Sequence, residues 1–390
     1  MLLLRVLFIL SAFVLDRPVF PLPGKNLQKT GLPAKAPALG IKTTGAIPSK
    51  SKAQNKKSSL FAKTNSTFQS WGVDPTFKSS WINHHKAWST FVKKKEIVVA
   101  IIDTGIDFNH KYLKGNIHVS EGIPGKSNFG KDFSTMPTKS KRNPSNAAPV
   151  DNHGHGTHVA GILKSVFPEV KILPIKYYNP KRSGQENLKS LTQSFEYAIR
   201  ARVDIINYSG GGPEPSVREL QLLKDAQRKG ILVIAAAGNE GANIDQKTHA
   251  FYPASYGLSN IVTVMAHDKE LSILSSSNWG KRSVDISAPG HRILSSVPHN
   301  SSARMTGTSQ ATAFVSGVAA LIKSQYPHFS PHDIKIILRR SAQRVKAFKG
   351  KSVTEGKLDA AKALTVAKEY NGKPGKPKSS KRGQKLVEAR

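Results

Sequence analysis

The sequence predicts an α/β protein of three layers, with a mainly parallel central sheet and helices on both faces. Two observations predict this fold: five short, mostly β-branched apolar runs, and helical patterns between them. Continuous apolar runs of this length are typical of strands covered on both faces. Strands that alternate with helices indicate parallel pairing through right-handed crossovers. The expected strands are Ile97–Ile102, Val170–Ile175, Val203–Asn207, Ile231–Ala236 and Asn260–Val264.

The clearest helical pattern between these strands lies at 186–200. Its apolar residues recur at one face of a helix and are Leu188, Leu191, Phe195, Ala198 and Ile199. A second helix is expected after the Gly/His-rich turn in Asp151–Gly161. A third, made largely of small residues, is expected to open at Thr306–Ala311.

Composition and charge exclude several kinds of protein. The chain of 390 residues is 38% hydrophobic and 22% charged, which is typical of a globular protein. It has no cysteine, which excludes disulfides, thiolate metal sites and a cysteine nucleophile. Its formal net charge is +34, with +10 in 1–73 and +6 in 371–390, which leaves +18 for 74–370. Such a surplus either attracts polyanions, such as anionic envelope surfaces, or serves only solubility and adhesion.

The two ends of the chain differ in composition from its middle. Met1–Leu15 is a short apolar run with one arginine, which predicts a signal peptide at 1–19 and a secreted protein, periplasmic or extracellular. The alternative is a short membrane-proximal anchor; no membrane span is expected after removal of a signal. We expect a basic flexible linker or pro-segment at 20–70, a folded domain at 71–370 and a basic disordered tail at 371–390.

Three short segments carry candidate chemistry, and each is ambiguous alone. Asp103-Thr104-Gly105 follows a strand, as in aspartic peptidases, but the second such carboxylate that those enzymes need is missing. Three histidines, His153, His155 and His158, could bind zinc, yet no nearby acid completes a ligand set. Ser309 at a helix start could simply be a cap. The informative feature is the order Asp, His, Ser, which differs from the α/β-hydrolase order.

Taken together, the three segments resemble the signature blocks of the subtilisin-like serine peptidases, or subtilases. The resemblance extends from about Trp71 to about Leu364. It implies a subtilisin-like three-layer fold, a peptidase domain at 71–370 and a serine endopeptidase with polypeptide substrates. The intermediate segments that agree are Ser209-Gly210-Gly211, Ala236-Ala237-Gly238-Asn239, Tyr252-Pro253-Ala254, Ser277-Asn278-Trp279-Gly280, Ala288-Pro289-Gly290 and Gly356–Ala361.

The family's roles suit these residue types. A serine hydroxyl is a poor nucleophile, so Ser309 needs a base to take its proton, and His155 can act as that base. Asp103 would orient the imidazole, and Asn239 would donate to the oxyanion. The resemblance also implies that Ser209, Gly210 and Gly211 pair with an extended substrate, as in strand addition.

The sequence departs from the family at several points. Gln310 and Ala313 replace the usual Met and Pro after the nucleophile, and neither position supplies a catalytic group. The loop that often binds calcium is missing, so we expect no required cofactor and no metal site, and structural calcium is unsupported. We expect a monomer without specific nucleic-acid binding. The alternative function is an inactive or weakly active scaffold that binds anionic polymers through its basic surface.

Overall fold

The computed structural model describes residues 70–119, 129–135 and 148–370. The expected signal peptide, linker or pro-segment and C-terminal tail therefore lie outside the described residues. Among the described residues, no helix is long and apolar enough to cross a membrane.

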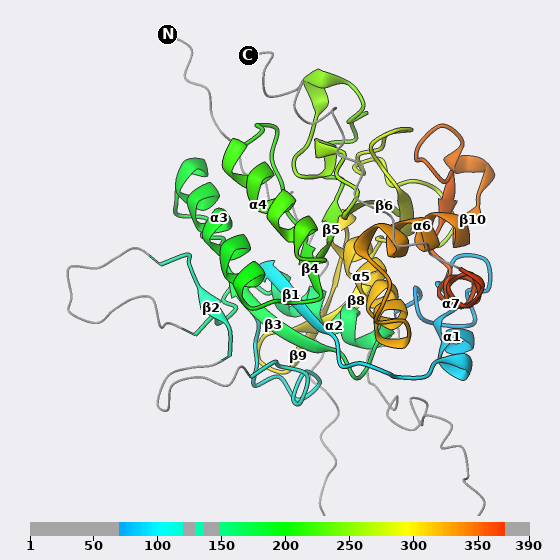
Figure 1. Ribbon diagram of the computed structural model, residues 1–390, viewed down its shortest axis with the longest axis horizontal. Helices are drawn as coiled ribbons and strands as arrows, with labels where there is room; N and C mark the ends of the chain where they lie inside the picture. Colours follow the sequence, from blue (N-terminus) through cyan, green and yellow to red (C-terminus); the bar gives the residue numbers. More distant parts are fainter. Residues whose placement is uncertain (1–69, 120–128, 136–147, 371–390) are drawn as a thin grey trace, which may run out of the picture.

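Within the described residues, a sheet of nine strands forms the centre of the molecule, in the order β10-β11-β7-β6-β5-β4-β1-β3-β2 (Figure 1). All of its pairings are parallel except that between β10 and β11. The strands are β1 Val98–Asp103, β2 Lys131–Asp132, β3 Lys171–Lys176, β4 Ile205–Tyr208, β5 Leu232–Ala236, β6 Ile261–His267, β7 Ile286–Pro289, β10 Gln343–Arg344 and β11 Gly356–Lys357. The five predicted strands correspond to β1, β3, β4, β5 and β6, and the mainly parallel sheet is confirmed.

Alternate residues of the strands enter two separate cores, one on each face of the sheet. In β1, for example, Val99 and Ile101 pack on one side, whereas Ala100 and Ile102 pack on the other. This alternation follows from the two-residue period of a strand and explains why the runs are apolar throughout. The three-layer architecture is therefore confirmed.

Helices α3 (Gly184–Arg200) and α4 (Val217–Arg228) cover one face (Figure 1). The apolar side predicted at 186–200 faces the sheet in α3, and Ser183 with Glu186 forms a capping box at its start. Two short helical turns, η3 (Lys247–His249) and η4 (Ala254–Tyr256), lie between β5 and β6 in the chain.

The other face is covered by α2 (His155–Val166) and α5 (Thr308–Gln325), which pack against each other. Gly317 permits this close crossing, because a Cβ there would lie 2.6 Å from Cβ of Val166. A hairpin of β8 (Ile293–Val297) and β9 (Ser301–Met305) packs on α2 and leads into α5. The helix of small residues predicted after Thr306 is thus a buried helix on this face.

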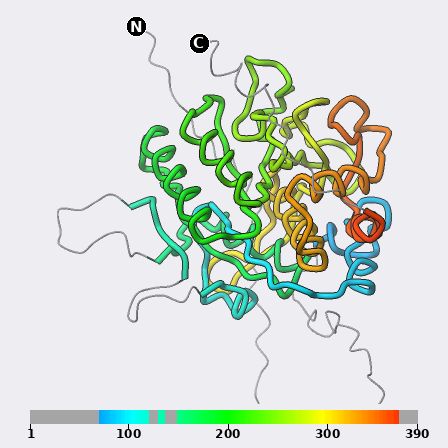
Figure 2. The backbone as a smooth tube through the Cα atoms, viewed as in Figure 1, coloured from blue at the N-terminus to red at the C-terminus, as the bar shows by residue number. Residues whose placement is uncertain are grey.

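The first and last described helices lie side by side. Helix α1 (His84–Thr90) packs against α7 (Ala360–Glu369), and α6 (Pro331–Ser341) packs against α7 in turn. Figure 2 shows the same neighbourhood as a blue segment next to a red one. A short turn, η5 (Lys346–Phe348), connects β10 to the segment that returns through β11.

The sheet has a switch point at β1. The chain proceeds from β1 to β3 on one side and later places β4 on the other side of β1. In open parallel sheets, ligands bind at the carboxyl ends of the strands beside such a reversal. Asp103 ends β1, and Ser209 directly follows β4, so two of the predicted site residues lie at this edge.

Candidate active site

Asp103 and His155 are joined by a buried hydrogen bond. Asp103 Oδ1 lies 2.6 Å from His155 Nδ1, and the two residues are 3% and 0% exposed. The same oxygen accepts the main-chain N–H of Thr104 at 2.7 Å. An ionised carboxylate can only accept, so the proton must reside on Nδ1. Nε2 of the neutral ring is then the acceptor, which is the state that a general base requires.

Glycines with positive φ bring both residues into position. Gly105 turns the chain after β1 with a φ of +100°, and a Cβ there would lie 2.5 Å from the carbonyl oxygen of Pro149. Gly154 precedes α2 with a φ of +102°. Because this conformation strains any residue with a side chain, these glycines determine where β1 ends and where α2 begins.

Ser309 lies in the first turn of α5 and is connected to the end of β4. Its hydroxyl donates to the carbonyl oxygen of Ser209 at 3.0 Å, and the Ser209 hydroxyl donates back to the Ser309 carbonyl at 3.4 Å. Asn207 strengthens this connection, since it donates to the Ser209 hydroxyl at 3.0 Å and accepts from Ser316 of α5 at 2.8 Å.

The pairing of β1 with β4 places this serine beside the Asp–His pair. Ile102 is level with Tyr208 in the register, so Asp103 and Ser209 are the next residues on neighbouring strands. Adjacent strands lie about 5 Å apart. Ser309, which is bonded to Ser209, therefore lies at the same edge as Asp103 and His155.

Asn239 follows β5 and contacts the start of α5. Its Oδ1 accepts the main-chain N–H of Thr308 at 2.8 Å and the Thr308 hydroxyl at 3.0 Å. The amide oxygen of Asn239 is therefore occupied by Thr308, the residue just before Ser309. The amide Nδ2 is therefore the end of the side chain that can donate to a ligand at the serine.

Asp151 also belongs to this site, although the sequence pattern predicted no role for it. Its Oδ1 accepts from the Thr104 hydroxyl at 2.9 Å and from the main-chain N–H groups of His153 and Gly154. Its Oδ2 accepts from the Thr157 N–H at 3.0 Å and hydroxyl at 2.6 Å. Asp151 thus joins the turn after Asp103 to the start of the helix that carries His155. Its place four residues before His155, in a turn of Gly and Asn, was the available signal.

The predicted substrate segment continues from β4 past Ser209. A Cβ at Gly210 would lie 2.6 Å from the Tyr177 hydroxyl, and one at Gly211 would lie 2.2 Å from the Phe251 ring. The protein's own packing therefore requires glycine at both positions, independently of the pairing with an extended substrate that the resemblance implies. Gly212 then exchanges two hydrogen bonds with Tyr252, at 3.0 and 2.8 Å, which holds the end of the segment in place.

His158, one of the three histidines considered for zinc, has a structural role. Its Nε2 lies 2.9 Å from the Ile293 carbonyl oxygen and 3.1 Å from that of Ala303, so it connects α2 to the β8–β9 hairpin. Complete burial lowers the pKa of His158 to about 3, which keeps the ring neutral. Within residues 70–119, 129–135 and 148–370, no three His, Asp or Glu residues are grouped as metal ligands.

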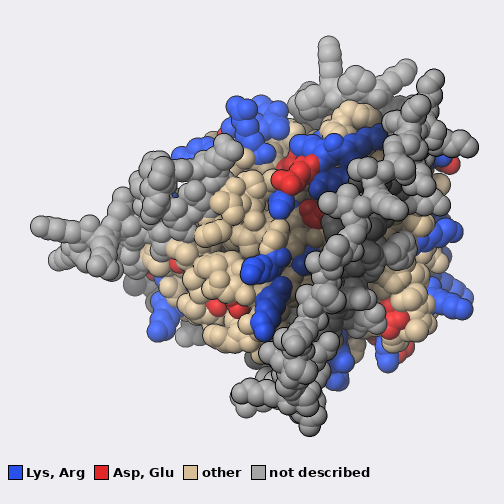
Figure 3. Space-filling model, turned by 90° about the horizontal axis from the view of Figure 1, so that it is seen from below, with Lys and Arg blue, Asp and Glu red and all other residues tan. Residues whose placement is uncertain are grey.

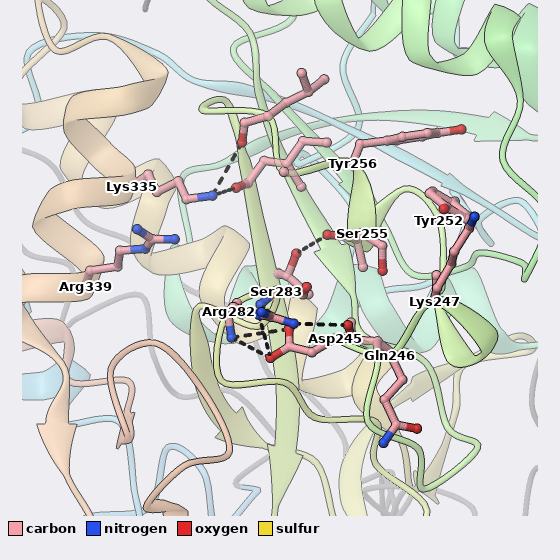
Figure 4. A pocket seen from close by; sticks show the side chains of 17 residues that line it. Asp245, Gln246, Lys247, Tyr252, Ser255, Tyr256, Arg282, Ser283, Lys335 and Arg339 are labelled. Carbon is pink, nitrogen blue, oxygen red and sulfur yellow. Dashed lines mark hydrogen bonds and ion pairs between the residues drawn. The ribbon is translucent and has the colours of Figure 1, made fainter. Parts of the chain in front are cut away.

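A cavity of about 530 Å³ lies elsewhere, and none of the predicted site residues lines it (Figure 4). Lys335 of α6 points into this region and donates to the carbonyl oxygens of Leu258 and Ile261. It also lies 3.2 Å from Asp285, which Arg339 contacts as well. Lys335 and Arg339 at this cavity thus hold β6 and the start of β7 to α6.

This fold and site define a three-layer α/β protein with a candidate serine nucleophile at the carboxyl edge of its mainly parallel sheet. The model of the subtilase family matches residues 94–371, and the chain belongs to that family. It is therefore a serine endopeptidase.

Individual relatives agree with this assignment. The major intracellular serine protease of Bacillus subtilis is 36% identical over 246 residues, or 61% of this chain and 71% of the relative. Subtilisin DY of Bacillus licheniformis is 33% identical over 261 residues, or 64% and 85%. The crystal structure of a cold-adapted subtilisin-like serine proteinase is similar with a TM-score of 0.56 and 26% identity, covering 68% of this chain and 88% of that one. The subtilisin-like fold predicted from the sequence is confirmed.

Proposed function

We propose that Ser309 is the nucleophile of this endopeptidase and that His155 and Asp103 activate it. The observation that carries the proposal is the buried 2.6 Å hydrogen bond between Asp103 and His155, which leaves Nε2 as the proton acceptor. Ser309 attacks the scissile carbonyl carbon while His155 takes the hydroxyl proton. His155 then gives this proton to the leaving amine, and an acyl-enzyme remains on Ser309. Water, activated by the same imidazole, releases the acid.

The developing oxyanion would be stabilised by two donors, the main-chain N–H of Ser309 and Nδ2 of Asn239. The bonds from Thr308 to Oδ1 of Asn239 support this role, because they direct the amide nitrogen away from Thr308. Asn239→Ala is expected to lower kcat by about 10²–10³-fold with a smaller change in KM, a magnitude that comes from a subtilisin. Steady-state kinetics on a peptide substrate would measure it, and an unchanged kcat would remove Asn239 from the oxyanion site.

Polypeptide substrates would pair with Ser209, Gly210 and Gly211 as an added strand. The direct continuation of this segment from β4, which ends beside Ser309, supports the assignment. The proposed chemistry uses protein groups alone, so it requires no cofactor or metal. Because Asp103, His155, Ser309 and Asn239 all belong to one chain, we also propose that a monomer is active. Neither the family assignment nor the site geometry favours the alternative of an inactive polyanion-binding scaffold.

Secretion and nonspecific polyanion contact remain proposals that rest on the sequence. The apolar Met1–Leu15 run supports export, whereas the relative from Bacillus subtilis is by its name intracellular. N-terminal sequencing of the protein from its host decides between them.

Figure 3 shows Lys and Arg side chains at several separate places on one face, interspersed with fewer acidic ones. Such a distribution supports weak, salt-sensitive contact with anionic surfaces rather than a specific nucleic-acid site.

The catalytic proposal is tested by labelling the purified protein with a fluorophosphonate serine probe, alongside Ser309→Ala and a casein digestion assay. We expect the wild type to be labelled and to digest casein, and the variant to do neither. Ser301→Ala, which alters a serine in β9, is the matched control and should keep both. Labelling that persists in Ser309→Ala would place the nucleophile elsewhere, and an unlabelled, folded wild type would overturn the proposal.

A further inference from the structure

A second, smaller cavity lies next to the proposed substrate segment. Its volume is about 190 Å³, and its wall is formed by the start of α3, the end of β4, the loop after it and α4. The lining residues that matter for its chemistry are Leu188, Tyr208, Gly212, Glu214, Glu219 and Tyr252. Most of the lining is apolar, so the carboxylates of Glu214 and Glu219 are the charged groups that an entering side chain would meet.

The position of this cavity relates it to a particular part of a bound peptide. Ser209 contacts the nucleophile, and Gly212 is three residues further along the same extended segment. A strand rises about 3.3 Å per residue, so Gly212 lies roughly 10 Å from the reacting bond. A substrate strand paired with this segment would place at the cavity a side chain about four residues before the bond that is cleaved.

Glu219 is an acid at this cavity that forms no ion pair within the described residues. Its side chain is buried, at 3% exposure, in the first turn of α4. Oε2 accepts from the Tyr256 hydroxyl at 2.8 Å, and among the described residues no Lys, Arg or His forms an ion pair with this carboxylate. Burial raises the pKa of Glu219 to about 7. A desolvated carboxylate in an apolar wall attracts a cation more strongly than an exposed one does.

Tyr256 alone does not account for an acid at this position. Its hydroxyl already accepts the main-chain N–H of Ser216 at 2.8 Å and lies 3.1 Å from the Ser216 carbonyl oxygen. An apolar residue at 219 would therefore leave the tyrosine with main-chain partners, while the carboxylate adds a desolvation cost. Glu214, exposed at the rim, places a second negative charge near the entrance.

We propose that this cavity binds a Lys or Arg side chain about four residues N-terminal to the cleaved bond, with Glu219 as the partner of its charge. The proposal rests on the proposed function, since the cavity has this meaning only if substrates pair with Ser209–Gly211. It assigns to this endopeptidase a preference for basic segments, despite the +34 net charge of the chain.

The test compares two chromogenic tetrapeptides that differ only in the first residue, arginine or the uncharged norleucine. Their last three residues are taken from a casein cleavage site mapped with the wild type. At pH 8 we expect kcat/KM to favour the arginine peptide by about ten-fold or more, as for other charge-assisted contacts. In Glu219→Gln and Glu219→Leu this ratio should fall to about one, because the charged partner is lost. Glu196→Gln, which removes an acid from the neighbouring α3, should keep the wild-type ratio.

A pH series on the wild type gives a readout that needs no variant. The arginine-to-norleucine ratio should rise between pH 6 and 8, because Glu219 must be ionised to bind a cation and its pKa is raised to about 7. The norleucine peptide corrects for every other ionisation that affects catalysis. A ratio near one in the wild type, or one that survives in both Glu219 variants, overturns the inference.

Failure of the inference and failure of the proposed function give different results. Fluorophosphonate labelling at Ser309 with equal cleavage of both peptides leaves the function intact and removes the basic preference. A wild type that is neither labelled nor able to cleave either peptide overturns both.

Discussion

Two buried carboxylates on different parts of this molecule lie in opposite electrostatic surroundings. Asp285, 1% exposed, contacts Lys335 and Arg339 and accepts the main-chain N–H of Thr263 at 2.7 Å. The side chain of Glu219, a residue 3% exposed, accepts from the hydroxyl of Tyr256 and from no other group in the described residues. The first acid has its counter-charge within the chain and holds β7 to α6. The second has none in the described residues and lines a cavity beside the proposed substrate segment.

The presence or absence of a cationic partner distinguishes a buried acid with a structural role from one with a candidate functional role. A buried charge is tolerated when partners surround it, and an unpaired one reduces stability. An acid that is kept without a partner, at the wall of a cavity, is a candidate for binding a cation that a ligand supplies. A third buried acid, Asp103, is intermediate, because its partner His155 becomes charged only during the proposed reaction.

The largest expected effect is a loss of turnover when Asp103 is replaced, because its partner His155 is the proposed general base. Asp103→Asn should lower kcat by about 10⁴-fold, because an amide no longer forces the proton onto Nδ1 of His155. Thermal stability should change far less than activity. Active-site labelling rates together with a melting curve would measure both. A variant with near wild-type turnover would show that Asp103 is a structural acid like Asp285.

The next largest expected effect is a loss of folding stability when Asp285, the acid between Lys335 and Arg339, is replaced. Asp285→Asn removes the buried charge that the partly exposed Lys335 and Arg339 contact, and the loss of this ion-pair cluster should cost about 3 kcal/mol of unfolding free energy, the lower end of the range for a buried pair. Denaturant unfolding would measure it, and kcat per labelled active site should stay within a few-fold. The matched control, Glu270→Gln, removes an exposed ion pair with Lys269 and should cost at most about 0.5 kcal/mol. Equal effects of the two variants would contradict the distinction.

Glu219→Leu is expected to act in the opposite direction and to stabilise the protein by about 1–3 kcal/mol at pH 8. The pKa of Glu219 is raised to about 7, so the folded state binds its proton more tightly than the unfolded state does. Its stabilising contribution is complete below the unfolded pKa and is lost as the pH rises through about 7. The advantage of the variant should therefore be larger at pH 8 than at pH 5 in melting curves. Destabilisation at pH 8 would show that Glu219 is needed for packing.

The smallest expected effect is at Gln310, directly after the proposed nucleophile. Its side chain is fully buried, and no group in the described part of the chain hydrogen-bonds with the amide. Gln310→Met keeps the volume and removes the unpaired polar group, so it should stabilise the protein by about 1 kcal/mol. Thermal unfolding beside Gln325→Met, which changes a partly exposed glutamine in the last turn of α5, would measure it. A lower melting temperature would indicate that the amide has a partner in solution.

The sequence by itself determined most of the fold and the identity of the proposed triad. The apolar runs identified β1, β3, β4, β5 and β6, because strands covered on both faces leave no polar period. The helix at 186–200 was predicted because its apolar face has the period of a helix. Asp103, His155 and Ser309 could be named because their motifs, taken together and in this order, resemble the signature blocks of the subtilases.

Only the tertiary structure decided how these residues are supported and what surrounds them. The carboxylate of Asp151 accepts five hydrogen bonds, from Thr104 after β1 and from residues 153–157 at the start of α2. No local sequence pattern predicts that donors from these two segments meet at one side chain. Glu219 looks like an ordinary acid at a helix start, where it favours the helix dipole. Its burial, and the cavity it lines, result from packing α3, α4 and two loops together. Whether a carboxylate is paired, as Asp285 is, or unpaired depends on residues far apart in the chain, so sequence spacing carries no information about it.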